Sequence, residues 1–203
     1  MKSFNPERAG LRIPHRGGPN QGRVGLRLST PLDFSVLKSL RAGDEVLFSG
    51  KVLTARDQAH KRIVAALKKG ARLPVDIKGR VIYYCGPTKT RPGSAIGSCG
   101  PTTAGRMDKM TVPLLKAGLR GMIGKGRRSP EVRQAIRKYR AVYFLATGGA
   151  GALLSKKVRS ARLVCYADLG PEAVVELTVK DFPLVVGIDA EGRDIFAHQE
   201  RKR

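Results

Sequence analysis

Tryptophan is absent from this 203-residue chain, and aromatic residues of all kinds make up only 5% of it. So few rings leave little with which to stack nucleic-acid bases. Long hydrophobic runs are absent too: no stretch approaches the roughly 18–20 consecutive apolar residues of a membrane-spanning helix, so we expect no integral membrane protein. The first residues lack the apolar segment of a secretory signal, and a cytoplasmic location is expected.

Cysteine is also scarce. Cys85, Cys99 and Cys165 lie far apart in the sequence, and no two of them form a C-x-x-C pair. This spacing predicts neither a disulfide framework nor a self-contained zinc or iron–sulfur site, so we expect this chain to hold no metal. An odd number of cysteines is ordinary for a reducing cytosol.

Acidic residues are heavily outnumbered, with 16 Asp and Glu against 39 Lys and Arg and a formal net charge of +23. Such a balance favours an anionic partner: nucleic acid, a membrane surface, an acidic protein or a polyanionic substrate. The cations are spread along the chain instead of forming one basic tail. We therefore expect weak, non-specific binding of polyanions.

The chain divides into two parts by composition. Residues 1–28 are rich in Gly, Pro and Arg without periodicity, which predicts a basic, flexible N-terminal extension. A mitochondrial transit peptide would share the arginines but would be amphipathic and richer in Ser. Residues 29–203 are predicted to form the folded domain, and 41% hydrophobic residues in the whole chain suffice for a core.

Apolar, strand-like runs alternate with helix-like segments in the folded part. Helices are predicted over residues 30–40, 55–69 and 103–116, the last broken near 111–113, and from Ser129-Pro130 onward. Strands are predicted at 45–48, 51–53, 80–85, 119–123, 141–146, 162–166, 173–179 and 184–188. This alternation predicts an α/β layered domain with at least partly parallel strand pairing.

Three glycine-marked loops follow predicted strands, at residues 86–106, 124–126 and 147–151. In an α/β sheet, loops at the carboxyl ends of the strands gather around a ligand. None of the three matches a P-loop, and 148–151 is too short for a dinucleotide fingerprint. Turns that need a positive φ would explain any one of these loops alone.

Three cations are candidates for binding an anionic ligand near these loops. Arg56 and Arg106 both lie in the first turn of a predicted helix, where two guanidinium forks beside positive helix ends would suit a dicarboxylate. Lys125 lies between two glycines, which lets a ligand approach its ammonium closely. The alternative for each residue is an ordinary solvated charge.

Two neighbouring hydroxyls and one histidine are further candidates. Thr102 and Thr103 follow Gly100-Pro101 and would by default cap a helix. The functional alternative is that one hydroxyl carries a proton to or from a substrate, which needs a pKa depressed by neighbouring cations. His60, one turn after Arg56, is more often a helix-face residue than a base.

These segments resemble the β part of class I fumarases and tartrate dehydratases. The resemblance covers roughly residues 28–198 and rests on 54–60, 100–108, 124–126 and the closing pattern 168–173 with 181–183. It implies the swivelling β/β/α fold. It also implies a fused or separate α part, which holds a 4Fe–4S cluster through three cysteines and leaves one iron open as a Lewis acid.

The resemblance further implies a function. The chain would be the β subunit of a heteromeric hydro-lyase, active only with its α subunit, in an α2β2 assembly acting on a 2-hydroxy dicarboxylate. Fumarate hydratase is our first hypothesis and L(+)-tartrate dehydratase the alternative. A basic nucleic-acid-binding or interaction protein on the same fold is the rival from another class.

Roles for single residues follow from the same resemblance. Thr102 would take the proton from carbon, and His60 and Asp57 would support the catalytic site. The carboxylates of the substrate would be bound by the three cations, Arg56, Arg106 and Lys125.

Overall fold

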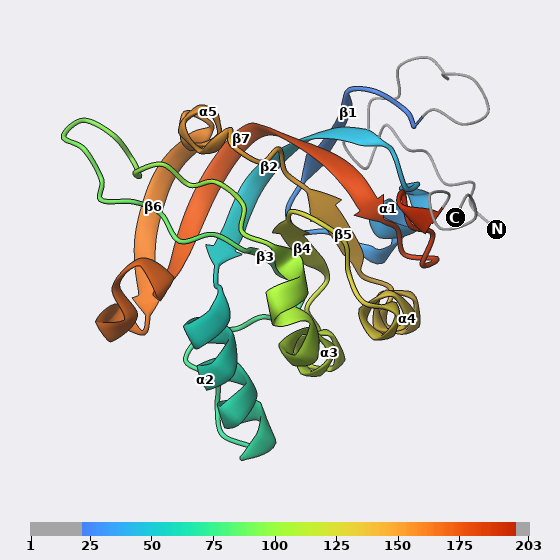
Figure 1. Ribbon diagram of the computed structural model, residues 1–203, viewed down its shortest axis with the longest axis horizontal. Helices are drawn as coiled ribbons and strands as arrows, with labels where there is room; N and C mark the ends of the chain where they lie inside the picture. Colours follow the sequence, from blue (N-terminus) through green and yellow to red (C-terminus); the bar gives the residue numbers. More distant parts are fainter. Residues whose placement is uncertain (1–21, 198–203) are drawn as a thin grey trace.

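Seven strands form one sheet that closes on itself in the computed structural model, which describes residues 22–197 (Figure 1). Strands β1 to β5 pair in sequence order and in parallel. The last strand in the sequence then pairs antiparallel with β5 and also with β2, which closes a ring. The strands are β1 (Leu26–Ser29), β2 (Glu45–Thr54), β3 (Val81–Tyr83), β4 (Gly121–Gly124), β5 (Val142–Leu145), β6 (Val158–Cys165) and β7 (Val174–Ile188).

Strand β7 makes this closure possible because it is 15 residues long. Along one edge it pairs with β2, and along the other it pairs first with β6 and then with β5. Closure satisfies the backbone groups that an open sheet edge would leave exposed. The predicted α/β class with partly parallel pairing is confirmed.

The helices lie outside the sheet. Three of them, α2 (Asp57–Lys68), α3 (Asp108–Lys116) and α4 (Pro130–Tyr139), follow parallel strands and lie on one side of the sheet (Figure 1). The others are the short helices α1 (Phe34–Ser39) and α5 (Gly151–Ser155) and the 3-10 helices η2 (Ala104–Met107) and η3 (Ala167–Glu172). None of the helices among residues 22–197 is long and apolar enough to cross a membrane.

Two hydrophobic cores result from the alternation of side chains along the strands. Val81 and Tyr83 of β3 belong to the core enclosed by the curled sheet, together with residues of β1, β2 and β7. Ile82, between them, points to the other face and packs with residues of α2, α3 and α4. One core therefore lies inside the curled sheet, and the other lies between the sheet and its helices.

Some predicted boundaries are wrong. The predicted strands 45–48 and 51–53 are one strand, β2, whose register shifts between Phe48 and Gly50. Likewise 173–179 and 184–188 are parts of one strand, β7. The break predicted near residues 111–113 occurs earlier, where the 3-10 helix η2 gives way to α3 at Asp108, and Pro113 lies inside α3 without ending it.

The predicted extension also ends too late. Residues 26–29 form β1, where Leu26 and Leu28 are buried against β2, so this part of the predicted extension belongs to the fold. The physical reason is the alternation of leucines with polar residues, which buries one face of the strand. Residues 1–21 lie outside the described residues.

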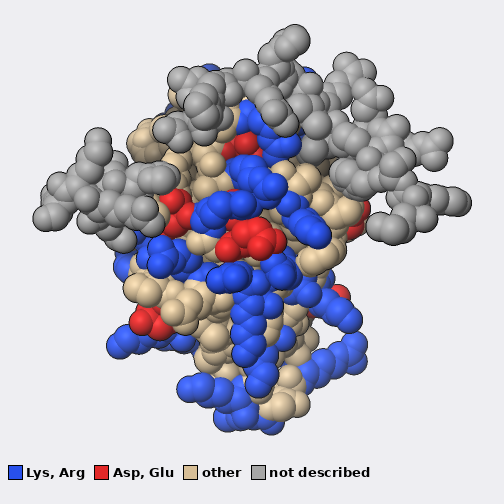
Figure 2. All heavy atoms as spheres, turned by 90° about the vertical axis from the view of Figure 1, so that its right-hand side faces the viewer, with Lys and Arg blue, Asp and Glu red and all other residues tan. Residues whose placement is uncertain are grey.

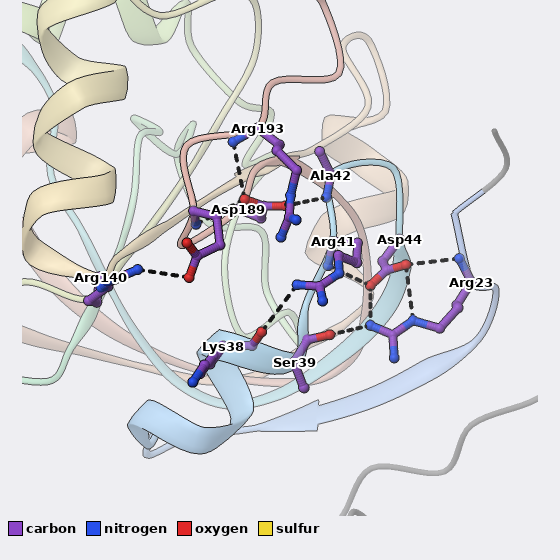
Figure 3. A network of polar contacts seen from close by, with 10 residues as sticks. Arg23, Lys38, Ser39, Arg41, Ala42, Asp44, Arg140, Asp189 and Arg193 are labelled. Carbon is purple, nitrogen blue, oxygen red and sulfur yellow. Dashed lines mark hydrogen bonds and ion pairs between the residues drawn. The ribbon is translucent and has the colours of Figure 1, made fainter. Parts of the chain in front are cut away.

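Two buried carboxylates fix the loop between α1 and β2 (Figure 3). Asp44 accepts hydrogen bonds from the guanidinium and backbone amide of Arg23 and from the amide of Arg41. Asp189, just after β7, accepts from the amide of Ala42 at 3.1 Å and from the Nε of Arg193 at 2.7 Å. These contacts connect the start of the sheet to its end.

Lys and Arg side chains cover much of the face that includes α4, with few acidic side chains between them (Figure 2). The last turns of α2, α3 and α4 all end in cations. Cations at helix C-termini offset the negative end of the helix dipole. Part of the excess charge therefore has a local structural explanation.

Glu176 of β7 is the centre of an ion cluster. Its side chain is 9% exposed and pairs with Arg80, Lys51 and Arg162, which come from three different parts of the sheet. The hydrogen bond from Arg80, more than the other contacts, lowers the pKa of Glu176 from 4.5 to about 2.

We predict that this cluster makes stability depend on pH. Because the pKa is depressed in the folded state, the stabilisation is present above about pH 4.5 and is lost as the pH falls towards 2. Glu176→Gln should lower the free energy of unfolding at pH 7 by about 1–3 kcal/mol. The difference from wild type, measured by urea unfolding, should shrink below pH 4.5. A constant difference across that range would contradict the role given to the carboxylate.

Candidate active site

The candidate site lies at the carboxyl-end edge of the parallel strands, where the loops after β2, β3, β4 and β5 meet. The three glycine-marked loops predicted to gather there are in contact. Thr103 pairs with Lys125 in a parallel bridge, and the amide of Cys99 donates to the carbonyl of Gly151 at 3.3 Å. The side chain of Lys125 passes close to Gly148. The fold thus brings segments some 50 residues apart in the sequence together at the carboxyl-end edge of the sheet.

Arg56 stands at the N-cap of α2, and its own side chain makes no capping hydrogen bond. Thr54, just before the predicted helix 55–69, does not cap α2, because its hydroxyl binds the carbonyl of Ala173 and the amide of Val175. Glu172 supplies the cap instead: its Oε2 accepts from the amide of Gln58 at 2.7 Å. A carboxylate at this positive helix end is favourable.

The guanidinium of Arg56 is held by two carboxylates. Its Nε lies 3.3 Å from Oδ2 of Asp57 and 3.5 Å from Oε1 of Glu172. Gly86 lies against it, since a Cβ there would come within 2.9 Å of the Arg56 Nη1 and 3.2 Å of the carbonyl of Pro171. The glycine after β3 thus leaves room for the arginine to lie across the backbone.

Asp57 joins the two arginines. The Nη2 of Arg106 donates to Oδ2 of Asp57 at 2.9 Å, the same oxygen that faces Arg56. Partial burial disfavours the ionised form of Asp57, but a backbone hydrogen bond and the two guanidinium groups outweigh it, so its pKa is lowered. Asp57 therefore stays ionised and sets the spacing of Arg56 and Arg106.

Thr102 belongs to the same network. The Nη2 of Arg106 also donates to Oγ1 of Thr102, at 2.7 Å. The backbone amide of Thr102 is fixed by the carbonyl of Tyr84 at 2.7 Å. Thr103 is exposed and, although it stands at the N-cap of η2, makes no capping hydrogen bond. The default interpretation of this pair as a helix cap is thus wrong, and only Thr102 faces the arginines.

Lys125 extends from a turn that is fixed by its backbone. Its amide donates to the carbonyl of Thr102 at 3.2 Å, and its carbonyl accepts from the amide of Ala104 at 2.9 Å. The side chain itself is exposed, and no carboxylate within residues 22–197 forms an ion pair with it. It is therefore available to an anion from outside.

His60 is fully buried beneath the arginines. Its Nδ1 lies 3.0 Å from the carbonyl of Arg56, and its ring packs edge-on against Tyr84. Burial is the main cause that lowers its pKa to about 4. A neutral imidazole with Nδ1–H donating to Arg56 fits this geometry. The structure thus places the His60 ring in the interior, in contact with the backbone of Arg56.

Two residues of this site, Glu172 and Arg128, were not among the functional candidates predicted from the sequence. Glu172 lies inside the closing pattern 168–173, which contributed to the resemblance but gave no function for its carboxylate. Arg128 was one of 39 cations, and only the fold shows that its side chain is buried. Long-range contacts of this kind leave no local signal.

The cysteines do not form a ligand set. Cys85 and Cys99 are buried, and burial raises the pKa of Cys99 to about 11 and that of Cys85 well above its usual range. Within residues 22–197 no group of three His, Cys, Asp or Glu side chains could hold a metal ion. These residues do not fit an iron–sulfur cluster.

Comparison with known families decides the relationship. The family model described as "Fumarase C-terminus" matches residues 7–199. The chain belongs to the fumarase C-terminus family. The family match also begins well before the predicted end of the extension.

Relatives of this fumarase C-terminus chain carry two kinds of name. A Methanocaldococcus jannaschii protein provisionally named L(+)-tartrate dehydratase subunit beta is 38% identical over 82% of this chain and 88% of its own length. The aerobic class I fumarate hydratase of Escherichia coli K12 is 40% identical over 73% of this chain. The L(+)-tartrate dehydratase subunit beta of the same strain is 30% identical over 86% of this chain and 88% of its own length.

The two kinds of relative differ in length. This chain aligns with only 27% of the Escherichia coli fumarate hydratase and 31% of fumarate hydratase 2 from Leishmania major. The family therefore contains class I fumarate hydratases, which are much longer, and tartrate dehydratase β subunits of similar length.

We predict that His60 stays neutral at every pH at which the protein works. Its folded pKa of about 4 lies below the ordinary 6.5, so protonation favours the unfolded chain as the pH falls from 6.5 to 4. The imidazole resonances of His60, followed by NMR, should be constant from pH 8 to about 5.5. His60→Gln, which cannot be charged, assigns the signal. A midpoint near 6.5 would contradict the buried, neutral role.

Proposed function

We propose that this chain is the β subunit of a heteromeric hydro-lyase that acts on a 2-hydroxy dicarboxylate. The observation that carries the proposal is the network in which one carboxylate, Asp57, spaces Arg56 and Arg106 while Arg106 binds the hydroxyl of Thr102. The family membership and the hydro-lyase names of the relatives support it.

The cations suit the two ends of a dicarboxylate. Arg56 and Arg106 are partly exposed at 29% and 45%, and each guanidinium can grip a carboxylate through two hydrogen bonds. Lys125 adds a third positive charge from the neighbouring turn. These groups also stabilise the negative charge that develops when a proton leaves the carbon next to a carboxylate.

Thr102 is the proton acceptor in this proposal. In its deprotonated form, the Oγ1 would take the proton from carbon and become the hydroxyl, and the hydrogen bond from Arg106 favours that negatively charged form. His60 and Asp57 support the site by holding Arg56 and Arg106.

Fumarate hydration to malate is the reaction we propose first, and L(+)-tartrate dehydration is the alternative. Relatives of both names match this chain at similar identity, 38% over 82% of the chain for the tartrate dehydratase relative and 40% over 73% for the fumarate hydratase. The geometry described above suits either substrate, because both present two carboxylates.

We further propose an α partner that holds a 4Fe–4S cluster, in an α2β2 assembly. The β-subunit names of two relatives and the unsuitable cysteines of this chain support a partner. One core inside the curled sheet and a second core beneath the helices support the swivelling β/β/α fold that we propose. Free cysteines without a disulfide fit a reducing compartment, and we propose a cytoplasmic location.

The rival is a nucleic-acid-binding role, favoured by the many cations on the face shown in Figure 2. Such a surface binds phosphate backbones weakly and loses them at physiological salt. The described chain shows no row of exposed aromatic rings that would read bases. We regard polyanion binding as a non-specific property of the charge.

The first test is reconstitution. The chain purified alone should be colourless and should dehydrate neither malate nor tartrate. Co-expressed with a cluster-bearing α subunit and purified anaerobically, it should form a brown complex that dehydrates one of the two. Robust activity of the chain alone, without iron, would refute the subunit proposal. Sequence-selective nucleic-acid binding at physiological salt, with no lyase activity in the complex, would favour the rival.

The second test separates proton transfer from binding. Thr102→Ala should lower kcat about 10²–10⁴-fold with little change in KM, because a proton acceptor matters only as the C–H bond breaks. Arg56→Lys should mainly raise KM, since an ammonium cannot replace the two-pronged guanidinium. Steady-state kinetics on the assembled complex, with iron content measured for each variant, gives both numbers.

Thr103→Ala is the matched control for Thr102→Ala. Thr103 is exposed and caps nothing, so its loss should change stability by less than about 0.5 kcal/mol and leave kcat unaltered. If Thr103→Ala loses kcat while Thr102→Ala keeps it, the proton acceptor has been assigned to the wrong hydroxyl.

A further inference from the structure

Arg128 lies directly beneath the candidate site with its side chain wholly buried. A buried guanidinium is costly unless all its charge and hydrogen bonds are compensated, and an apolar residue of similar size is often no less stable. The residues that contact Arg128 therefore indicate why a buried positive charge is placed there.

The guanidinium is enclosed on every side. Its Nε donates to Oδ1 of Asp108 at 2.7 Å, and its Nη2 donates to Oγ1 of Thr111 at 2.7 Å. The rings of Tyr84 and Tyr143 lie near it, with centroids 5.4 and 5.0 Å from its Cζ. Two cation–π contacts and a carboxylate make this a fully partnered buried cation.

Tyr84 connects this cation to two parts of the site. Its carbonyl fixes the amide of Thr102 at 2.7 Å. Its ring packs against His60 with centroids 5.2 Å apart, and His60 in turn binds the carbonyl of Arg56. Gly124 lies against the Tyr84 ring, and a Cβ there would come within 3.0 Å of it.

Asp108 and Tyr143 connect the Arg128 guanidinium to the segments that carry Arg106 and Lys125. Asp108 follows Arg106 by two residues, and its second oxygen accepts from the amide of Ser129 at 2.6 Å. The hydroxyl of Tyr143 donates to the carbonyl of Gly126 at 3.0 Å, next to Lys125. The segments that carry Arg56, Arg106 and Lys125 thus all depend on residues that contact one guanidinium.

We propose that Arg128 is a positioning residue that sets the relative placement of Thr102 and the three substrate-binding cations. The proposal rests on the proposed function for its effect on catalysis, but the placement itself can be measured without activity. A lysine would not suffice, since one ammonium cannot bind Asp108 and Thr111 and also contact both tyrosine rings.

The test compares Arg128→Lys with Arg80→Lys. Arg80 also binds a largely buried carboxylate, that of Glu176, but stands before β3 at the opposite end of the strand from the site loops. In the assembled complex, Arg128→Lys should lower kcat/KM about 10–100-fold, mostly through kcat, because small misplacements of reacting groups are costly. Arg80→Lys should lower Tm and leave kcat/KM unchanged.

A second measurement uses the full chain alone. Amide hydrogen exchange at Thr102, Ala104 and Lys125, whose N–H groups hold the site loops together, should be roughly tenfold or more faster in Arg128→Lys. Arg80→Lys should leave these amides unchanged. If Arg128→Lys fails to fold, Tyr143→Phe keeps the ring, removes only the bond to Gly126 and should speed exchange at Lys125.

The outcomes separate the two proposals. If the wild-type complex has no lyase activity, the proposed function fails, and the exchange rates still decide the role of Arg128. If exchange at the three amides stays at the wild-type rate in Arg128→Lys, or kcat/KM is unchanged while Tm falls as in Arg80→Lys, Arg128 is a stabilising residue only and the positioning proposal is overturned.

Discussion

The fold depends on a small number of carboxylates that must each neutralise several cations. With 16 acidic residues against 39 basic ones, like-charge repulsion would oppose any close approach of basic segments that lacked an acid between them. Asp44 joins Arg23 to the loop before β2, and Glu176 binds cations from three parts of the sheet. Each of these acids lies where chain segments distant in the sequence meet.

The candidate site also places a carboxylate between cations, and there the carboxylate fixes the positions of the arginines. Asp57 accepts from both arginines through one oxygen, and Asp108 pairs with a buried arginine directly below. A carboxylate between two guanidinium groups keeps them apart at a fixed spacing while it cancels part of their repulsion. The positive charge left over, on Lys125 and on the outer edges of the arginines, faces the solvent.

The sequence allowed much of this to be predicted. Strand-like runs and helix signals such as Ser129-Pro130 identified the main elements, because these depend on neighbours in the chain: Ser129 does cap α4. Loops after parallel strands had to meet at one edge, which placed Arg56, Thr102, Arg106 and Lys125 together. Contacts between distant segments could not be predicted, such as those of the Thr54 hydroxyl with residues more than a hundred positions away. Glu172 and Arg128 acquire their roles in the same way, through contacts that no local pattern records.

The pairing of Arg56 and Arg106 with the protein's own carboxylates has a consequence for turnover. The internal partners use only the Nε of Arg56 and the Nη2 of Arg106. On the proposed function, a dicarboxylate therefore takes the remaining N–H donors of the two arginines, while Asp57 and Glu172 stay in place. The internal carboxylates cancel part of the positive charge that the ligand meets, so a product anion is held less tightly and can leave the pocket.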